Sequence, residues 1–249
     1  MKHAKRHPLI FGTIILTATG LITRVIGFFY RIYLSRLFGE EGMGIYQLLS
    51  PALSLSFSLT AAGYQTAISK YVAADSAKRP SGNLKPLLAG TSITLPLSLV
   101  TNAILFFSAD PIGIFLLKDH RTVPMLRILS FSVPFAALHA CINGYFYGKK
   151  KASVPALTQL LEQLARVSCV FLVTGADLAE GRTPSINAAV LGLTVGEIFS
   201  MLIALVCLYM HLYPDSSILS LQNICPSVPV YRDLLGMALP LTANRIVLN

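Results

Sequence analysis

The stretch Gly20-Leu-Ile-Thr-Arg24-Val-Ile-Gly27-Phe-Phe-Tyr-Arg31 decides how this chain is organised. It lies inside an apolar run, residues 9–38, that is long enough to cross a bilayer, whose hydrocarbon core strongly disfavours charge. The stretch nevertheless carries two arginines and no acidic residue. Because two helical turns separate them, Arg24 and Arg31 project from nearly the same face, roughly 10 Å apart. Both glycines fall on that face, which therefore either packs closely on another helix or lines a wet cavity.

Composition indicates an integral membrane protein. The chain has 249 residues, of which 54% are hydrophobic and 12% are charged, and soluble domains of this size carry far more charge. The net charge of +9 could favour nucleic acid as a partner. Most basic residues, however, cluster in short loops between apolar runs, which is the pattern of membrane proteins.

The spacing of apolar runs predicts the all-α fold of a polytopic membrane helix bundle. A loop is expected at 39–44, and Pro51 is expected to kink the second helix. The predicted membrane helices cover residues 7–37, 45–72, 86–107, 123–147, 152–173 and 184–212. A seventh run begins near Leu234 and continues to the last residue. We therefore expect a six-helix transmembrane lobe over 1–212, a connector over 213–233, and the truncated start of a seventh helix over 234–249, which together resemble one lobe of a two-lobe transporter.

Further polar side chains lie within the predicted helices. Glu162 and Arg166 are spaced i,i+4 with the acid N-terminal, the favourable order for an ion pair, and pairing lowers the cost of each charge in lipid. The pair could be structural or functional. His139 is interpreted as a packed histidine in preference to a proton carrier. Arg245, in the seventh run, is a further candidate for substrate binding beside the two arginines of the first helix.

The distribution of lysine and arginine predicts the orientation. With a cytoplasmic N-terminus, eleven of these residues fall on the cytoplasmic side and five on the opposite side. The remaining four lie within the predicted helices at positions 24, 31, 166 and 245. Cytoplasmic loops of membrane proteins carry an excess of basic residues, so we expect the N-terminus to be cytoplasmic.

Four segments carry a resemblance to a known family. They are Thr23-Arg-Val-Ile-Gly-Phe-Phe-Tyr-Arg31, Leu37-Phe-Gly-Glu-Glu-Gly-Met-Gly-Ile-Tyr46, Ala67-Ile-Ser-Lys-Tyr-Val-Ala73 and Leu161-Glu-Gln-Leu-Ala-Arg166. They resemble the stage V sporulation protein B branch of the polysaccharide transporters. That branch belongs with MurJ-type lipid II flippases in the superfamily of multidrug, oligosaccharidyl-lipid and polysaccharide exporters. The resemblance implies about fourteen helices in two lobes, so this chain would correspond to the N-terminal lobe and would lack the C-terminal one.

The resemblance also implies a function. Its members are thought to move lipid-linked saccharides, whose head groups carry a diphosphate, across the cytoplasmic membrane for cell-wall, spore-cortex or polysaccharide synthesis. By resemblance, Arg24 and Arg31 correspond to arginines of the central cavity, and arginine offers fixed donors to phosphate oxygens. The sequence has no Walker motif and no catalytic constellation. We therefore expect neither an enzyme nor a cofactor, and an ion gradient or the membrane potential as the driving force.

Two other classes of function stay open. A cation-coupled multidrug antiporter usually places an acidic residue in the membrane to exchange a cation, and the acids within the predicted helices are Glu162 and Glu197. The truncated seventh run also allows a membrane scaffold or a nonfunctional fragment. Replacing Arg24 with alanine discriminates between them, because a flippase should lose substrate passage whereas a scaffold should be nearly indifferent.

Overall fold

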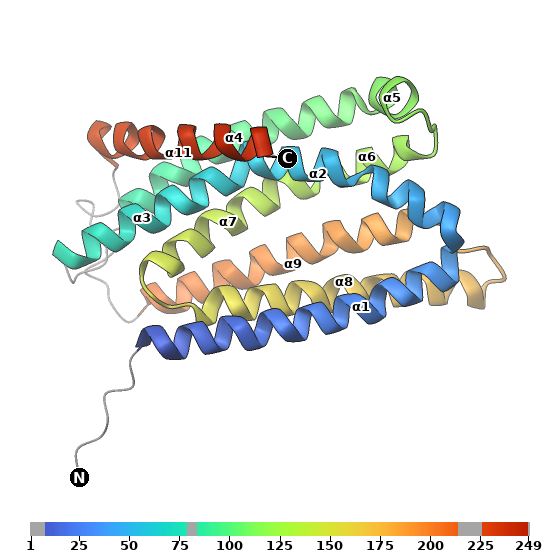
Figure 1. Cartoon of the computed structure of the whole chain (residues 1–249), viewed down its shortest axis with the longest axis horizontal. Helices are drawn as coiled ribbons and strands as arrows, with labels where there is room; N and C mark the ends of the chain where they lie inside the picture. The colour runs from blue at the N-terminus through green and yellow to red at the C-terminus, as the bar shows by residue number, and fades with distance from the viewer. Residues whose placement is uncertain (1–7, 79–83, 214–225, 249) are drawn as a thin grey trace, which may run out of the picture.

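The chain is an all-α bundle whose long helices lie side by side (Figure 1). The computed structural model describes residues 8–78, 84–213 and 226–248. The helices are α1 (Pro8–Leu48), α2 (Ser50–Phe57), the π-helical turn η1 (Ser58–Ala62), α3 (Gly63–Lys78), α4 (Lys85–Phe107), α5 (Ala109–Pro111), the π-helical turn η2 (Ile112–Leu116), α6 (Thr122–Ser130), α7 (Ser132–Gly148), α8 (Ser153–Ala179), α9 (Asn187–Leu212) and α11 (Val228–Leu248). In the view of Figure 1, α1 and α11 lie at opposite edges of the bundle.

The apolar helices match the membrane-protein interpretation. Five helical segments of the described chain are long and apolar enough to cross a membrane. The first of them, Gly12–Ser76, is 65 residues long and folds back on itself, so that α3 runs antiparallel to the first part of α1 (Figure 1). Large apolar side chains point outward, among them Phe107, Phe115 and Leu172. Such a surface suits contact with lipid tails.

The loop that the sequence predicted at 39–44 is reduced to a turn at Gly39, because residues 40–44 are helical. The chain turns at Gly39, whose backbone has a φ of 69° and a ψ of −176°. This conformation is essentially restricted to glycine, and one such residue is enough to redirect a helix. The bend is held from outside by Arg121, whose Nη2 lies 2.7 Å from Oε1 of Glu41.

Replacing Gly39 with alanine is expected to destabilise the fold by about 1–3 kcal/mol, because a Cβ atom is strained at this φ and ψ. Gly44 is the matched control, since it lies in the same segment and a Cβ there would meet nothing within 4 Å. Thermal unfolding of the detergent-solubilised variants measures the effect. Equal melting temperatures for G39A and G44A would contradict this account of the bend.

Two further helix breaks follow from proline, which lacks the N–H that an α-helix requires. The second predicted helix is interrupted at Leu49, between α1 and α2, close to Pro51. The helix predicted over 123–147 is likewise divided at Phe131 into α6 and α7. Pro134 accounts for this break, because it offers no N–H to the carbonyl of Ser130.

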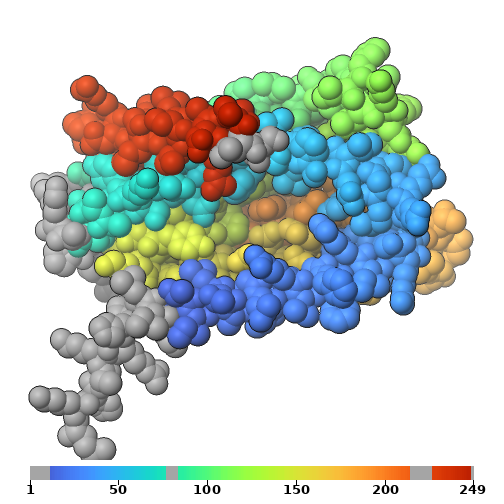
Figure 2. All heavy atoms as spheres, viewed as in Figure 1, coloured from blue at the N-terminus to red at the C-terminus, as the bar shows by residue number. Residues whose placement is uncertain are grey.

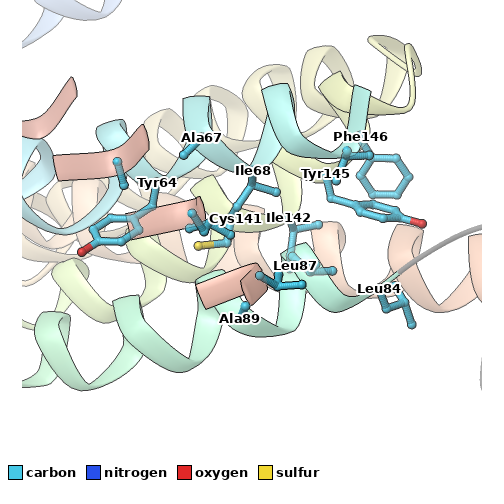
Figure 3. Packing of buried hydrophobic residues seen from close by; sticks show 14 of the residues in the cluster. Tyr64, Ala67, Ile68, Leu84, Leu87, Ala89, Cys141, Ile142, Tyr145 and Phe146 are labelled. Atoms are coloured by element: carbon cyan, nitrogen blue, oxygen red, sulfur yellow. The ribbon is translucent and has the colours of Figure 1, made fainter. Parts of the chain in front are cut away.

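The largest buried cluster joins α3, α4, α7 and α11 (Figure 3). Ile68, Leu87, Ile142 and Tyr145 pack together there and are almost fully buried. Lipid tails are as apolar as these side chains, so close packing stabilises the cluster more than the removal of water does. Close approach depends on glycine: a Cβ on Gly144 of α7 would lie 2.6 Å from the backbone oxygen of residue 65.

The last helix differs from its prediction at its start. It begins at Val228, whereas the sequence indicated a start near Leu234. The expected connector over 213–233 falls largely on 214–225, outside the described residues. A Cβ on Gly63 would lie 2.1 Å from Oγ1 of Thr242, so the packing of α11 on the second predicted helix requires glycine at this position.

Candidate functional site

A cleft opens on the face of the bundle drawn in Figure 2. One wall is α1 and the other is the segment from α2 to α3, while α8 and α9 are visible at its floor. The cleft contains three cavities that share side chains. Arg166 lines the first two cavities, and Glu197 lines the first and the third. Charged groups of α8 and α9 therefore lie where neighbouring cavities meet.

The cavity beside α1, here called the arginine pocket, has a volume of about 420 Å³. Arg24, Arg31 and Arg166 line it, and none of the described residues in its lining is acidic. The other lining residues are Thr23, Gly27, Phe28, Tyr30, Leu34, Tyr46 and Gln163. Three guanidinium groups facing one partly open space make a site that attracts anions, and arginine forms paired hydrogen bonds to phosphate or carboxylate oxygens.

Contacts between α1 and α8 hold the arginine pocket in shape. The hydroxyl of Tyr33 lies 2.7 Å from Oγ1 of Thr174, and the Tyr33 ring stacks on Phe171 with centroids 4.1 Å apart. Leu34 is fully buried beside α8 and α9. Because these contacts fix the rotation of α1, the face with Arg24 and Arg31 turns toward the cleft.

Two polar groups at the pocket have no partner within the described part of the chain. They are the buried hydroxyl of Tyr30 and the buried Nε of Arg166. Tyr30 is 6% exposed, and a buried polar atom without a hydrogen bond costs about 1–3 kcal/mol. Other atoms of Arg166 are engaged: Nη2 forms an ion pair with Glu162, and Nη1 lies 3.3 Å from Oε1 of Gln163. An oxygen-rich ligand in the pocket could satisfy both groups.

The cavity on the other side of Glu162, here called the histidine pocket, has a volume of about 250 Å³. His139, Glu162 and Glu197 line it, one each from α7, α8 and α9. Ligand-type atoms of these three side chains lie within 4.8 Å of one another. Nδ1 of His139 lies 3.7 Å from Oε2 of Glu197 and 3.1 Å from Oγ of Ser200. The Glu162–Arg166 ion pair thus connects the histidine pocket to the arginine pocket.

Glycines on α9 bring the two acidic residues together. A Cβ on Gly192 would lie 3.0 Å from the backbone oxygen of Arg166, and one on Gly196 would lie 3.1 Å from that of Glu162. Small residues four apart let transmembrane helices approach closely. Because α8 and α9 are in contact along this face, Glu197 of α9 lies beside Glu162 of α8.

The structure brings some of the sequence-predicted residues together and separates another. Arg24, Arg31 and Arg166 share the arginine pocket, although the sequence indicated Arg166 only as part of an ion pair. Arg245 lies exposed on α11 and is not among the residues that line this pocket. The sequence did not indicate Tyr30 or Gln163 as residues of this pocket. The helical spacing of Gln163 and Arg166 places both on one face of α8, whereas the burial of Tyr30 depends on packing against α8.

Comparisons with known proteins support a transporter fold. The chain matches the family model described as polysaccharide biosynthesis protein over residues 9–249. It is 34% identical over 239 residues to stage V sporulation protein B of Bacillus subtilis, and this alignment covers 96% of this chain and 46% of that protein. It is 27% identical over 179 residues to the lipid II flippase MurJ of the same organism, which covers 68% of this chain and 32% of that protein. The chain therefore spans less than half the length of these relatives.

Solved structures share the fold. A MOP superfamily transporter from Pyrococcus furiosus superposes with a TM-score of 0.72 at 17% identity, over 99% of this chain and 56% of that one. A multidrug resistance MATE family transporter of the MOP superfamily, in an outward-facing conformation, gives a TM-score of 0.71 at 16% identity, over 96% of this chain and 52% of that one. At these identities the likeness concerns the fold alone.

Proposed function

This chain belongs to the polysaccharide biosynthesis protein family, and from that premise we propose that it forms the N-terminal lobe of a flippase for lipid-linked saccharide diphosphates. The observation that carries the proposal is the convergence of Arg24, Arg31 and Arg166 on one pocket without an acidic residue in its lining. Arg166 is compensated by its ion pair with Glu162, whereas no ion pair of Arg24 or Arg31 is found among the described residues. An arginine without such a partner is costly in a membrane-spanning segment, so the retention of Arg24 and Arg31 supports a functional role.

The proposed ligand is the diphosphate of the head group. Its dense negative charge matches Arg24 and Arg31, which offer several donors each and keep their charge. The Tyr30 hydroxyl and the Arg166 Nε, both buried without a partner in the described chain, are additional donors for phosphate oxygens. Arg245 stays a weaker candidate, because it is exposed on α11 rather than in the arginine pocket. In this proposal, the Glu162–Arg166 ion pair sets how much positive charge Arg166 contributes to the arginine pocket.

The proposed transport step needs no covalent chemistry. The head group crosses in the polar cleft while its lipid tail stays in the bilayer, as expected if a C-terminal lobe encloses the cleft from the open side. The proposed location is the cytoplasmic membrane. The proposed substrate is a lipid-linked precursor of peptidoglycan, spore cortex or another polysaccharide. The proposed driving force is an ion gradient or the membrane potential. The relatives, a sporulation protein and a lipid II flippase, support this choice of substrate class.

Ligand binding tests the proposed function. The chain, reconstituted in lipid nanodiscs, is titrated with a polyprenyl diphosphate, the corresponding monophosphate and the free alcohol. We expect the affinity to fall in that order, because each lost phosphate removes charge-assisted hydrogen bonds. Equal binding of the alcohol and the diphosphate would mean that the cleft recognises the lipid tail alone, and the flippase proposal would be abandoned.

The proposed orientation predicts which loops face the cytoplasm. Lys150, between α7 and α8, and Arg182, between α8 and α9, are both exposed. In a background without the native cysteines, a membrane-impermeant maleimide applied to intact cells should label R182C and leave K150C unlabelled. Labelling of K150C in lysed cells is the control for reactivity. The opposite pattern in intact cells would reverse the orientation.

A further inference from the structure

The histidine pocket holds an unbalanced charge. When both are ionised, Glu162 and Glu197 contribute two negative charges, against the one positive charge of Arg166, which pairs with Glu162. These side chains are poorly exposed: 17% for Glu162, 22% for Glu197 and 9% for His139. An unpaired charge in a region of low dielectric constant is costly. One additional positive charge would make the cluster neutral, and His139 is the group placed to carry it.

Both nitrogens of His139 are already positioned by hydrogen-bonding neighbours. Nε2 lies 2.8 Å from Nδ2 of Asn143, and Nδ1 lies 3.1 Å from Oγ of Ser200, with the Glu197 carboxylate 3.7 Å away. This arrangement favours a proton over a metal ion, because a metal would have to displace Ser200 from Nδ1 or Asn143 from Nε2. Because Nδ2 of Asn143 can only donate, Nε2 accepts its hydrogen bond and the neutral ring carries its proton on Nδ1, beside Glu197. A second proton goes to Nε2 when the Asn143 amide turns its Oδ1 toward the ring, and the charged ring then forms an ion pair with Glu197.

We propose that His139, Glu162 and Glu197 form a proton-binding site, and that proton uptake there strengthens anion binding in the arginine pocket through Arg166. The inference rests on the proposed function, since it needs an anion in the arginine pocket. It adds a binding site to that function and names the group that would couple the two.

Arg166 is the link because it faces both sites. It lines the arginine pocket, and its Nη2 pairs with Glu162, which lines the histidine pocket. When His139 is charged, it offsets part of the negative charge of the two glutamates. The electrostatic attraction between Arg166 and an anion in the arginine pocket is then stronger. Coupling of this kind is reciprocal: a bound anion also favours the charged histidine.

The groups that face His139 limit which side chains can bind the proton. Among the described residues lining the histidine pocket, the other titratable groups are Glu162, Glu197 and Tyr147. The α2–α3 segment contributes Phe57 and Gln65 to the lining, neither of which is charged. Tyrosine ordinarily loses its proton far above neutral pH, so a pH dependence near neutrality belongs to the histidine and the two glutamates.

Calorimetric titration with sulfate tests the coupling in the full chain. Sulfate is a tetrahedral dianion that does not titrate near neutral pH, so any proton exchange belongs to the protein and the buffer. Titrations at pH 6.5 and 8 in buffers with different ionisation enthalpies report how many protons are taken up. We expect tighter binding at the lower pH, by at most about tenfold per pH unit for one linked proton, and proton uptake on binding.

Variants separate the two sites. H139N should bind sulfate with no pH dependence and without proton uptake, whereas H120N, at an exposed turn outside the cleft, should behave as the unmodified protein does. If H139N does not fold, E197Q is the alternative variant. It should shift the pH dependence of sulfate binding to lower pH. Sulfate binding that is independent of pH in the unmodified protein would overturn the coupling and leave the arginine pocket intact.

Two further outcomes have distinct meanings. Failure of the unmodified protein to bind sulfate at either pH would overturn the anion site and the coupling together. A melting temperature that rises with micromolar Zn²⁺ or Mn²⁺ in the unmodified protein, and not in H139N, would replace the proton with a metal ion as the occupant of the histidine pocket.

Discussion

Replacing Arg24 with alanine is expected to weaken binding of a polyprenyl diphosphate by about ten- to a hundredfold, because a hydrogen bond to a charged group contributes about 1.5–3 kcal/mol and every 1.4 kcal/mol is a factor of ten. Arg24 lines the arginine pocket from α1. The same loss is expected for Arg31, which lies two turns further along. The measurement is the titration in nanodiscs described above for the phosphate series.

Arg36 provides the matched control, since it lies exposed on the same helix and is not among the residues lining the pocket. R36A should bind with nearly unchanged affinity. All variants should melt at the same temperature as the unmodified protein, because Arg24 and Arg31 are exposed to the cleft. If R24A, R31A and R36A weakened binding equally, the effect would be a general loss of positive charge, and the specific pocket would be disproved.

Replacing Gly144 with alanine is expected to destabilise the α3–α7 contact strongly. The new Cβ would lie 2.6 Å from the backbone oxygen of Gln65 and 3.2 Å from two other backbone atoms of that residue. Backbone atoms cannot move aside as side chains do, so overpacking here should cost about 1–3 kcal/mol or more. Thermal unfolding in detergent should show a melting temperature several degrees lower.

Gly175 of α8 is the control for this change. It also lies within a long helix, and a Cβ there would meet nothing within 4 Å. G175A should leave the melting temperature unchanged or raise it slightly, because alanine favours the helix more than glycine does. A similar loss of stability in both variants would indicate that the effect comes from the helices themselves rather than from the contact with Gln65.

The fold was largely predictable because apolar runs and charged loops report directly on a membrane environment. The resemblance to the polysaccharide transporters is confirmed by the family match over residues 9–249. The error at 39–44 has a physical cause. Glu40, Glu41 and two glycines suggested a loop, yet the turn needs only the conformation of Gly39, and the residues after it remain helical. The expected kink near Pro51 is confirmed, whereas the break near Pro134 was not predicted, and Pro96 and Pro240 lie within continuous helices.

The candidate site was predictable only where one helix decides it. The 3.6-residue period places Arg24 and Arg31 on one face, and both line the same pocket. The proximity of Arg166 to them, and of His139 to Glu197, depends on how α1, α7, α8 and α9 pack. No spacing within one segment contains that information. Arg245 shows the same dependence on packing, because it lies in an apolar run and yet is not among the residues that line the arginine pocket.

The bend at Gly39 also limits how the length of this segment can vary. A flexible loop would absorb an inserted residue, but here helix continues on both sides of a single turning residue. Each residue added or removed after the bend would rotate all that follows by about 100° about the helix axis. Such a change would carry Tyr46 away from the arginine pocket and Gln65 away from the histidine pocket. We therefore expect indels to be excluded between the two walls of the cleft and tolerated at the exposed turn near Gly181.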